Sequence, residues 1–287
     1  MRDQAEELRL KMLKGQGRLA KSIAIVSGKG GVGKSNFSTN FAYSLQLKGK
    51  KVIVVDMDLG MGNIHILLGV TPRYSLKDYL LGEQSLDAVL NRDMHGLAFI
   101  SGGSGLDTIL DWTEPMFERL LLAFERLQQD YDVILFDMGA GATQRSIDLI
   151  VAVDEVIVIS TTEPTSITDA YSMMKFICLQ DADKKFSIVT NRVSKGQDGN
   201  ESATRLQYAM KKFLAKETTL LGFLPEDAVV HKSVIAQKPF ILEYPNALIS
   251  KRLLAIADMY VTDNQLEPIE KTKFIQKLKG IFLKGRD

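Results

Sequence analysis

The chain has 287 residues, with 36 Lys and Arg and 35 Asp and Glu, so its formal net charge is +1. This near-neutral net charge gives no argument for a protein that coats nucleic acid. A hydrophobic content of 45% and a charged content of 25% exclude disorder as the dominant state. One cysteine, Cys178, excludes an internal disulfide framework and favours a reducing cytoplasmic compartment. No apolar run approaches the roughly 20 residues that span a bilayer.

Residues 1–20 form a charged helix candidate ahead of the first predicted strand. Asp3 and Glu6 have the spacing of a capping box, and Ala5, Leu8 and Met12 make a small apolar stripe. On these residues alone, the segment is predicted to be a capped N-terminal helix.

Between residues 21 and 262, short apolar runs alternate with helical stretches. The runs lack clean polar–apolar alternation, which is typical of strands buried on both faces of a parallel sheet. This order predicts βα units and an α/β fold, a doubly wound and mostly parallel sheet flanked by helices. The predicted strands are Ile23–Val26, Val52–Val55, Leu97–Ile100, Val133–Phe136, Val156–Ile159, Ser187–Val189 and Leu220–Leu224. The predicted helices include Ser35–Leu47, Glu114–Leu127, Ile167–Leu179, Ala203–Leu214 and Leu248–Tyr260.

The first predicted strand runs directly into S-G-K-G-G-V-G-K-S, which opens a predicted helix. This fits the phosphate-loop motif G-x-x-x-x-G-K-[ST] in the strand-before, helix-after context that the motif requires. Backbone amides of the loop and of the helix N-terminus would hold the phosphates, Lys34 would reach the β- and γ-phosphates, and Ser35 would ligate Mg²⁺. The nucleotide-binding residues predicted here are Gly28, Lys29, Gly30, Gly31, Val32, Gly33, Lys34, Ser35 and Asn36.

Two further predicted strands end in acidic residues. Val52–Val55 is followed by Asp56 and Asp58, and Val133–Phe136 is followed by Asp137. Carboxylates at strand ends beside a phosphate loop are well placed for magnesium and water. An apolar run closing on aspartate is a Walker B signal, which predicts that Asp137 holds Mg²⁺ through water.

The additional Lys29 gives the loop the form K-G-G-x-G-K-S, which resembles the deviant Walker motif of the MinD/ParA family of dimerising ATPases. The resemblance covers roughly residues 21–262. It implies ATP-dependent homodimers in which Lys29 touches the partner's nucleotide, with Asp58 in D-x-D-x-G positioning the attacking water at the magnesium site. The family usually has proline two residues after the Walker B aspartate, where this chain has Gly139.

Two later segments match the positions where MinD-like proteins hold adenine and ribose. They are Asn191-Arg192 and Pro225-Glu226-Asp227, each following a predicted strand. A neutral amide such as Asn191 can pair with the adenine edge, whereas a guanine-specific enzyme would more typically present N-K-x-D. The sequence therefore favours ATP over GTP.

The last segment, residues 263–287, is strongly basic. An apolar face with i, i+1, i+4, i+7 and i+8 spacing is surrounded by lysines, as in short helices that anchor at a membrane surface. The pattern resembles the C-terminal membrane-targeting sequence of MinD, and two such helices in a dimer would bind an anionic membrane by avidity. The alternative is that this face packs on the domain, and both arrangements can hold in different states. The face consists of Phe274, Ile275, Leu278, Ile281 and Phe282.

The N-terminal D-Q-A-E-E-L-R resembles the D-Q-A-x-x-L-R segment of the FlhG branch of the family, MinD-like regulators of flagellar number and placement. The resemblance implies that Gln4 orders the catalytic water of the SRP-type flagellar GTPase FlhF, with Asp3, Leu8 and Arg9 docking the segment. It also implies contact with flagellar switch (C-ring) proteins, slow switch-type ATP hydrolysis and peripheral membrane association in the ATP state.

Alternative functions remain open at this stage. A ParA-type partition ATPase would need a surface basic patch, for which Lys184, Lys185, Arg192 and Lys195, or Lys211 and Lys212, are candidates; the amphipathic tail argues against DNA as the partner. A division-site MinD would not need the N-terminal segment. Relatives of nitrogenase iron protein are excluded, because they need two cysteines per chain for an interfacial iron–sulfur cluster.

Overall fold

The computed structural model describes residues 19–59, 62–103, 113–139, 144–194, 199–262 and 273–284. Within this part of the chain, one sheet has the strand order β3-β4-β2-β5-β1-β6-β7-β8. Its neighbours pair in parallel except β3, which runs antiparallel to β4. The strands are β1 (Lys21–Val26), β2 (Val52–Asp56), β3 (Leu90–Arg92), β4 (Ala98–Ile100), β5 (Val133–Asp137), β6 (Glu155–Thr161), β7 (Lys185–Val193) and β8 (Thr219–Pro225).

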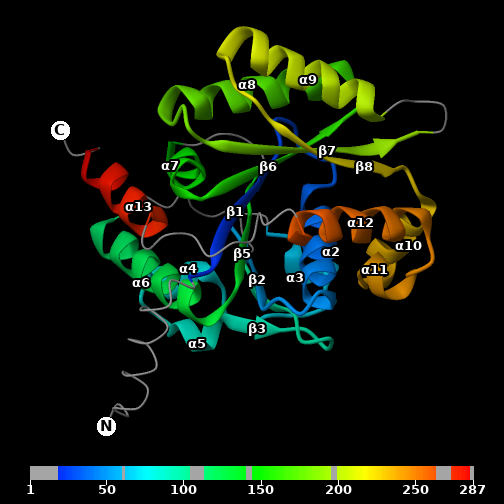
Figure 1. Cartoon of the computed structure of the whole chain (residues 1–287). Coiled ribbons are helices and arrows are strands. Elements are labelled where there is room, and N and C mark those ends of the chain that lie inside the picture. The colour runs from blue at the N-terminus through cyan, green and yellow to red at the C-terminus, as the bar shows by residue number, and fades with distance from the viewer. Residues whose placement is uncertain are drawn as a thin grey trace.

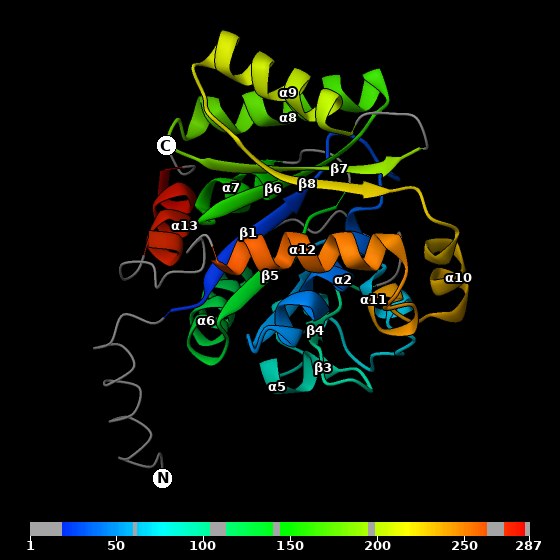
Figure 2. The same ribbon diagram turned by 45° about the vertical axis from the view of Figure 1, so that its right-hand side comes forward.

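Helices cover both faces of the sheet, as Figures 1 and 2 show. They are α2 (Lys34–Leu47), α3 (Ile64–Leu67), α4 (Leu76–Leu80), α5 (Leu86–Val89), α6 (Glu114–Asp130), α7 (Gln144–Ala152), α8 (Pro164–Gln180), α9 (Gly199–Leu214), α10 (Ala228–Ala236), α11 (Phe240–Glu243), α12 (Leu248–Thr262) and α13 (Lys273–Lys284).

The central strands contribute to two separate cores because successive side chains point to opposite faces of a sheet. In β1, Ile23 and Ile25 join the core beneath α2 and α12, whereas Ala24 and Val26 join the core beneath α6, α7 and α8. Burial on both faces explains why these runs lack polar alternation, and it confirms the predicted doubly wound α/β fold.

All seven predicted strands and the five predicted helices are present. The sequence prediction missed β3, because Leu-Asn-Arg at the sheet edge is only partly buried and carries no apolar run. It also missed α7 and α10, which have nine residues each, and the short helices α3, α4, α5 and α11. The predicted N-terminal helix lies outside the described residues.

The C-terminal helix α13 lies beside α6 and α7 in both ribbon views (Figures 1 and 2). Phe274, Ile275 and Leu278 are buried in the same core as α6 and α7, and Ile281 packs against it. The side chain of Phe282 lies outside the described residues. The expected exposed apolar face is therefore covered in this structure, which is the packed arrangement that the sequence left as the alternative. Among the described residues, no helix is long and apolar enough to cross a membrane.

Candidate functional site

A cleft of about 680 Å³ lies at the carboxyl ends of β1, β2, β7 and β8. Parallel α/β sheets commonly bind ligands at this edge. Most of the predicted nucleotide-binding residues meet there, although they come from separate parts of the chain. The predicted residues that line the cleft are Gly30, Gly31, Gly33, Lys34, Ser35, Asn36, Asp58, Asn191, Arg192, Pro225, Glu226 and Asp227.

The loop between β1 and α2 is shaped around Gly33. Its φ of 93° is in the left-handed region, and a Cβ there would lie 2.5 Å from Asn191 Nδ2, so only glycine fits. Asn191 Nδ2 donates to the Val32 carbonyl at 2.8 Å and ties the loop to β7. The amides at the start of α2 therefore face the cleft, an arrangement that binds phosphate.

Lys34, which lines the cleft, forms a buried pair with Asp137, which lies behind the lining residues. Lys34 Nζ lies 3.1 Å from Asp137 Oδ1, and their side chains are 11% and 2% exposed. Ser38 Oγ donates to the same carboxylate oxygen at 2.8 Å. The phosphate-loop lysine and the Walker B aspartate thus meet as predicted, while Ser38 was missed because it lies outside any motif.

A second carboxylate, Asp56, is buried near this pair. It accepts hydrogen bonds from the backbone N–H groups of Asp58 at 3.1 Å and Ile64 at 3.2 Å. Burial, together with the negative charge of Asp137, raises the pKa of Asp56 to about 7. This part of the site has excess negative charge that a cation would relieve.

Asp58 lies between the two acidic strand ends. It lines the cleft, and a Cβ built on Gly139 would lie 3.5 Å from its carboxyl group. Asp58, which follows β2, and Gly139, which follows β5, therefore lie close to each other.

The donor set at this position fits Mg²⁺. Ser35, Asp58 and Asp137 offer oxygen ligands, the type that Mg²⁺ prefers. Within the described residues, no three of His, Cys, Asp and Glu gather into a complete protein cage. Magnesium usually keeps several waters and takes further ligands from substrate phosphates, so an incomplete protein shell is expected.

The base end of the cleft combines polar strand ends with an apolar wall. Arg192, which lines the cleft, has a φ of 55° at a register shift between β7 and β8. Glu226 accepts from Ser194 Oγ at 2.8 Å, and Asp227 caps α10 by accepting from Val229 N–H at 3.1 Å. The apolar wall could not be found from motifs, because its residues come from unrelated elements. It consists of Leu67, Leu224, Val230, Val234, Phe240 and Ile249.

Lys29 lies outside the lining of the cleft. Its Nζ is 3.0 Å from Glu163 Oε2 at the start of α8, and the two side chains are 46% and 63% exposed. Gly28 packs tightly on the same helix, since a Cβ there would lie 2.1 Å from the carbonyl carbon of Asp169. The early lysine is therefore held at an exposed position beside the cleft by a glutamate that sequence reasoning missed.

Comparison with known proteins agrees with this geometry. The sequence matches the family described as ParA: NUBPL iron-transfer P-loop NTPase over residues 18–261. It is 32% identical to the antiactivator FleN of Pseudomonas aeruginosa over 82% of this chain and 84% of that protein. It is 33% identical to the flagellum site-determining protein YlxH of Helicobacter pylori over 91% of this chain and 88% of that protein.

Solved structures of MinD proteins have a similar fold. The septum site-determining protein MinD of Pyrococcus horikoshii, complexed with Mg-ADP, has a TM-score of 0.70 and 25% identity, covering 88% of this chain and 100% of that chain. The cell division ATPase MinD of Pyrococcus furiosus has a TM-score of 0.69 and 25% identity, covering 85% and 99%. The sequence match, the sheet order and the phosphate loop agree, and the chain belongs to the ParA/MinD family of P-loop ATPases.

Proposed function

We propose that this chain is an ATP-dependent switch that forms a homodimer, associates peripherally with anionic membrane and controls flagellar placement and number. The observation that carries the proposal is a cleft lined by the phosphate loop and Asp58, with Asp137 paired to Lys34 behind it and a basic amphipathic helix packed on the same domain. The flagellar part is supported by the names of the relatives FleN and YlxH.

The predicted site residues have the following roles in this proposal. Lys34 and the α2 amides hold the phosphates, and Ser35 and Asp137 hold Mg²⁺, which neutralises phosphate charge when bound. Asp58 orients the attacking water, and Asn191 contacts adenine. Arg192, Pro225, Glu226 and Asp227 surround the rest of the nucleoside. Because the nucleotide acts as a switch, hydrolysis is slow.

The position of α13 supports a connection between the cleft and the membrane. The Phe274 ring centroid lies 5.7 Å from that of Phe136, the residue before Asp137. The same helix packs on α7, which begins a few residues after Gly139. A rearrangement of the segment after Asp137 would therefore act directly on the surface that holds α13, and its release would present the apolar face to lipid.

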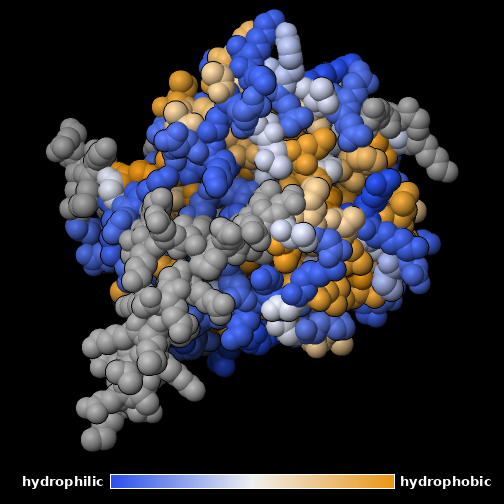
Figure 3. Space-filling model, viewed as in Figure 1, coloured by the Kyte–Doolittle hydropathy of each residue, from blue (hydrophilic) through white to orange (hydrophobic). Residues whose placement is uncertain are grey.

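An exposed apolar region beside the cleft supports the homodimer. On α10, which helps to line the cleft, Val234 is 39% and Ile235 is 70% exposed. Figure 3 shows hydrophobic colour gathered over the part of the molecule where Figure 1 places α2, α12 and α10. A second copy facing the cleft would cover this surface and bring each Lys29 to the other nucleotide.

Replacing Lys29 with alanine tests the dimer directly. Since Lys29 is exposed and outside the cleft, we expect Lys29→Ala to bind ATP within about twofold of wild type but to remain monomeric, because the trans contact with phosphate is lost. Sedimentation velocity with ATP and with ADP measures this, with Lys51→Ala as an exposed-lysine control. An ATP-dependent dimer of Lys29→Ala would contradict the proposed role.

Residues 1–20 are proposed to stimulate the SRP-type flagellar GTPase FlhF, with Gln4 ordering its water and Asp3, Leu8 and Arg9 docking. A peptide of residues 1–20 should raise GTP hydrolysis by the purified GTPase, and the same peptide with Gln4→Ala should not. No stimulation by the unaltered peptide would remove the partner assignment and leave division-site placement as the function. Contact with flagellar C-ring proteins is part of the same proposal.

The DNA-binding alternative loses one of its residues in this structure. Lys184 is 2% exposed and cannot belong to a surface patch, and Lys195 lies outside the described residues. Lys211 is paired with Glu217 at 2.7 Å. Iron transfer, named in the description of the matching family, gains no support either, since Cys178 is half-buried and burial raises its pKa.

A further inference from the structure

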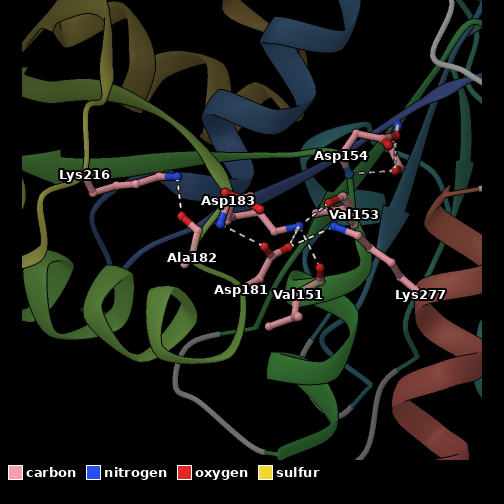
Figure 4. Close-up of polar contacts among 10 residues, drawn as sticks. Val151, Val153, Asp154, Asp181, Ala182, Asp183, Lys216 and Lys277 are labelled. Carbon is pink, nitrogen blue, oxygen red and sulfur yellow. Dashed lines mark hydrogen bonds and ion pairs between the residues drawn. The ribbon is translucent and has the colours of Figure 1, made fainter.

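A second polar cluster lies at the far end of α7 (Figure 4). Lys184 is buried between α8 and β7, and its Nζ donates to the carbonyl of Val151 at 2.6 Å and to that of Val153. A lysine at this position satisfies carbonyls at a helix C-terminus and complements the helix dipole. Burial and the charge of Lys277 lower the pKa of Lys184 to about 8. The buried ammonium group of Lys184 therefore helps to hold the C-terminus of α7.

The carboxylate of Asp181 joins this ammonium group to α13. Asp181 Oδ2 lies 3.4 Å from Lys184 Nζ and 2.9 Å from Lys277 Nζ, so one side chain serves both lysines. Asp181 is 14% exposed, whereas Lys277 is 44% exposed. The C-terminus of α8, the C-terminus of α7 and the middle of α13 thus meet at one carboxylate.

A second ion pair holds the other side of α13. Lys279 Nζ lies 2.8 Å from Glu125 Oε1 on α6, with both side chains partly exposed. The two lysines flank Leu278, which is buried in the core. The apolar face of α13 therefore packs into the core, and Asp181 and Glu125 pair with the lysines beside that face.

The helix α13 cannot lie on the domain and on a membrane surface at the same time. In the packed position Lys277 and Lys279 contact carboxylates, whereas a helix lying on a membrane directs its lysines to anionic headgroups. We propose that Asp181 and Glu125 form an acidic latch that holds α13 on the domain and competes with anionic lipid for Lys277 and Lys279. This inference rests on the proposed membrane function, but the latch itself can be measured without lipid.

Partly exposed ion pairs contribute little individually, so each pair is expected to change release of α13 by about two- to fivefold. Hydrogen–deuterium exchange of residues 273–284, without nucleotide or lipid, measures that release. Glu125→Gln should raise the exchange rate of α13 by this factor. Asp87→Asn is the matched control, since it removes an exposed partner of Arg126 on the same α6 without touching α13. Equal rates in Glu125→Gln and wild type would overturn the latch.

Asp181→Asn should also raise the exchange rate of α13, but it deprives buried Lys184 of its carboxylate and can loosen α7 as well. The Glu125–Lys279 pair is therefore the better subject for a double-mutant cycle. Glu125→Lys should release α13, and adding Lys279→Glu should restore slow exchange, because the pair is re-formed with reversed charges. If the double variant exchanges as fast as Glu125→Lys, the ion pair does not hold the helix.

Vesicles containing anionic lipid separate this inference from the proposed function. With ADP, Glu125→Lys should bind such vesicles about two- to fivefold better than wild type. The double variant should bind worse than wild type with ATP, since Lys279→Glu repels the headgroups. If the variants change the exchange rate of α13 but no protein binds vesicles, the latch stands and the membrane function is wrong. If the exchange rate of α13 does not change but wild type binds vesicles with ATP, the membrane function stands and the latch is wrong.

Discussion

Replacing Lys34 with alanine is expected to abolish measurable ATP hydrolysis and to weaken nucleotide binding by about 100-fold or more, because its ammonium group is proposed to neutralise the β- and γ-phosphates. The change also leaves Asp137, which is 2% exposed, without its cation. Breaking a buried pair in this way costs about 3 kcal/mol of folding free energy. Isothermal titration with ATP and thermal unfolding measure the two effects.

Lys185→Ala provides the control for this prediction, since Lys185 is an exposed lysine at the start of β7, away from the cleft. It should match wild type in both experiments. Near-normal hydrolysis by Lys34→Ala would show that the cleft at the carboxyl ends of β1, β2, β7 and β8 is not the site of catalysis.

Asp58→Ala is expected to separate binding from hydrolysis. The carboxylate lines the cleft beside Gly139 and is proposed to orient the attacking water, so its loss should slow ATP cleavage by about 10²- to 10³-fold. ATP affinity should fall little, because Lys34 and the α2 amides remain. The ATP-bound dimer should therefore persist, which single-turnover hydrolysis and size-exclusion chromatography with ATP measure.

Two outcomes would contradict the role of Asp58. A variant that stays monomeric with saturating ATP would show that Asp58 is needed for assembly rather than for hydrolysis. A variant with unchanged hydrolysis would show that another group orients the water. Asp183→Ala, which removes an exposed aspartate just before the start of β7, whereas Asn191 lies near the other end of that strand, should behave as wild type in both assays.

The strands and the phosphate site could be predicted from sequence because their signals are local. The run Ile23–Val26 is apolar because it is a strand buried on both faces of the sheet. Glycine is needed at position 33 because the backbone there is in the left-handed region. Asn191, Glu226 and Asp227 could be placed by resemblance alone. The edge strand β3 carries no such signal, since its side chains are not buried on both faces.

Contacts between distant segments could not be predicted. The sequence makes Lys184 a candidate surface lysine, yet it is buried because α7 ends beside it and offers carbonyl groups. The pairing of Lys29 with Glu163 depends on how α8 starts against the loop. The amphipathic pattern of α13 identified its apolar face, but a pattern cannot tell whether lipid or the α6–α7 surface covers that face.

We propose that ATP controls the attachment of this chain to membrane through α13. Co-sedimentation with anionic liposomes tests this, in ATP and in ADP, with the full chain and with a chain that ends at Asp263. We expect the full chain to pellet with ATP several-fold more than with ADP, and the shortened chain to stay in the supernatant with either nucleotide. Equal pelleting of both chains, or none by the full chain with ATP, would contradict the membrane switch and leave α13 as a packing element of the domain.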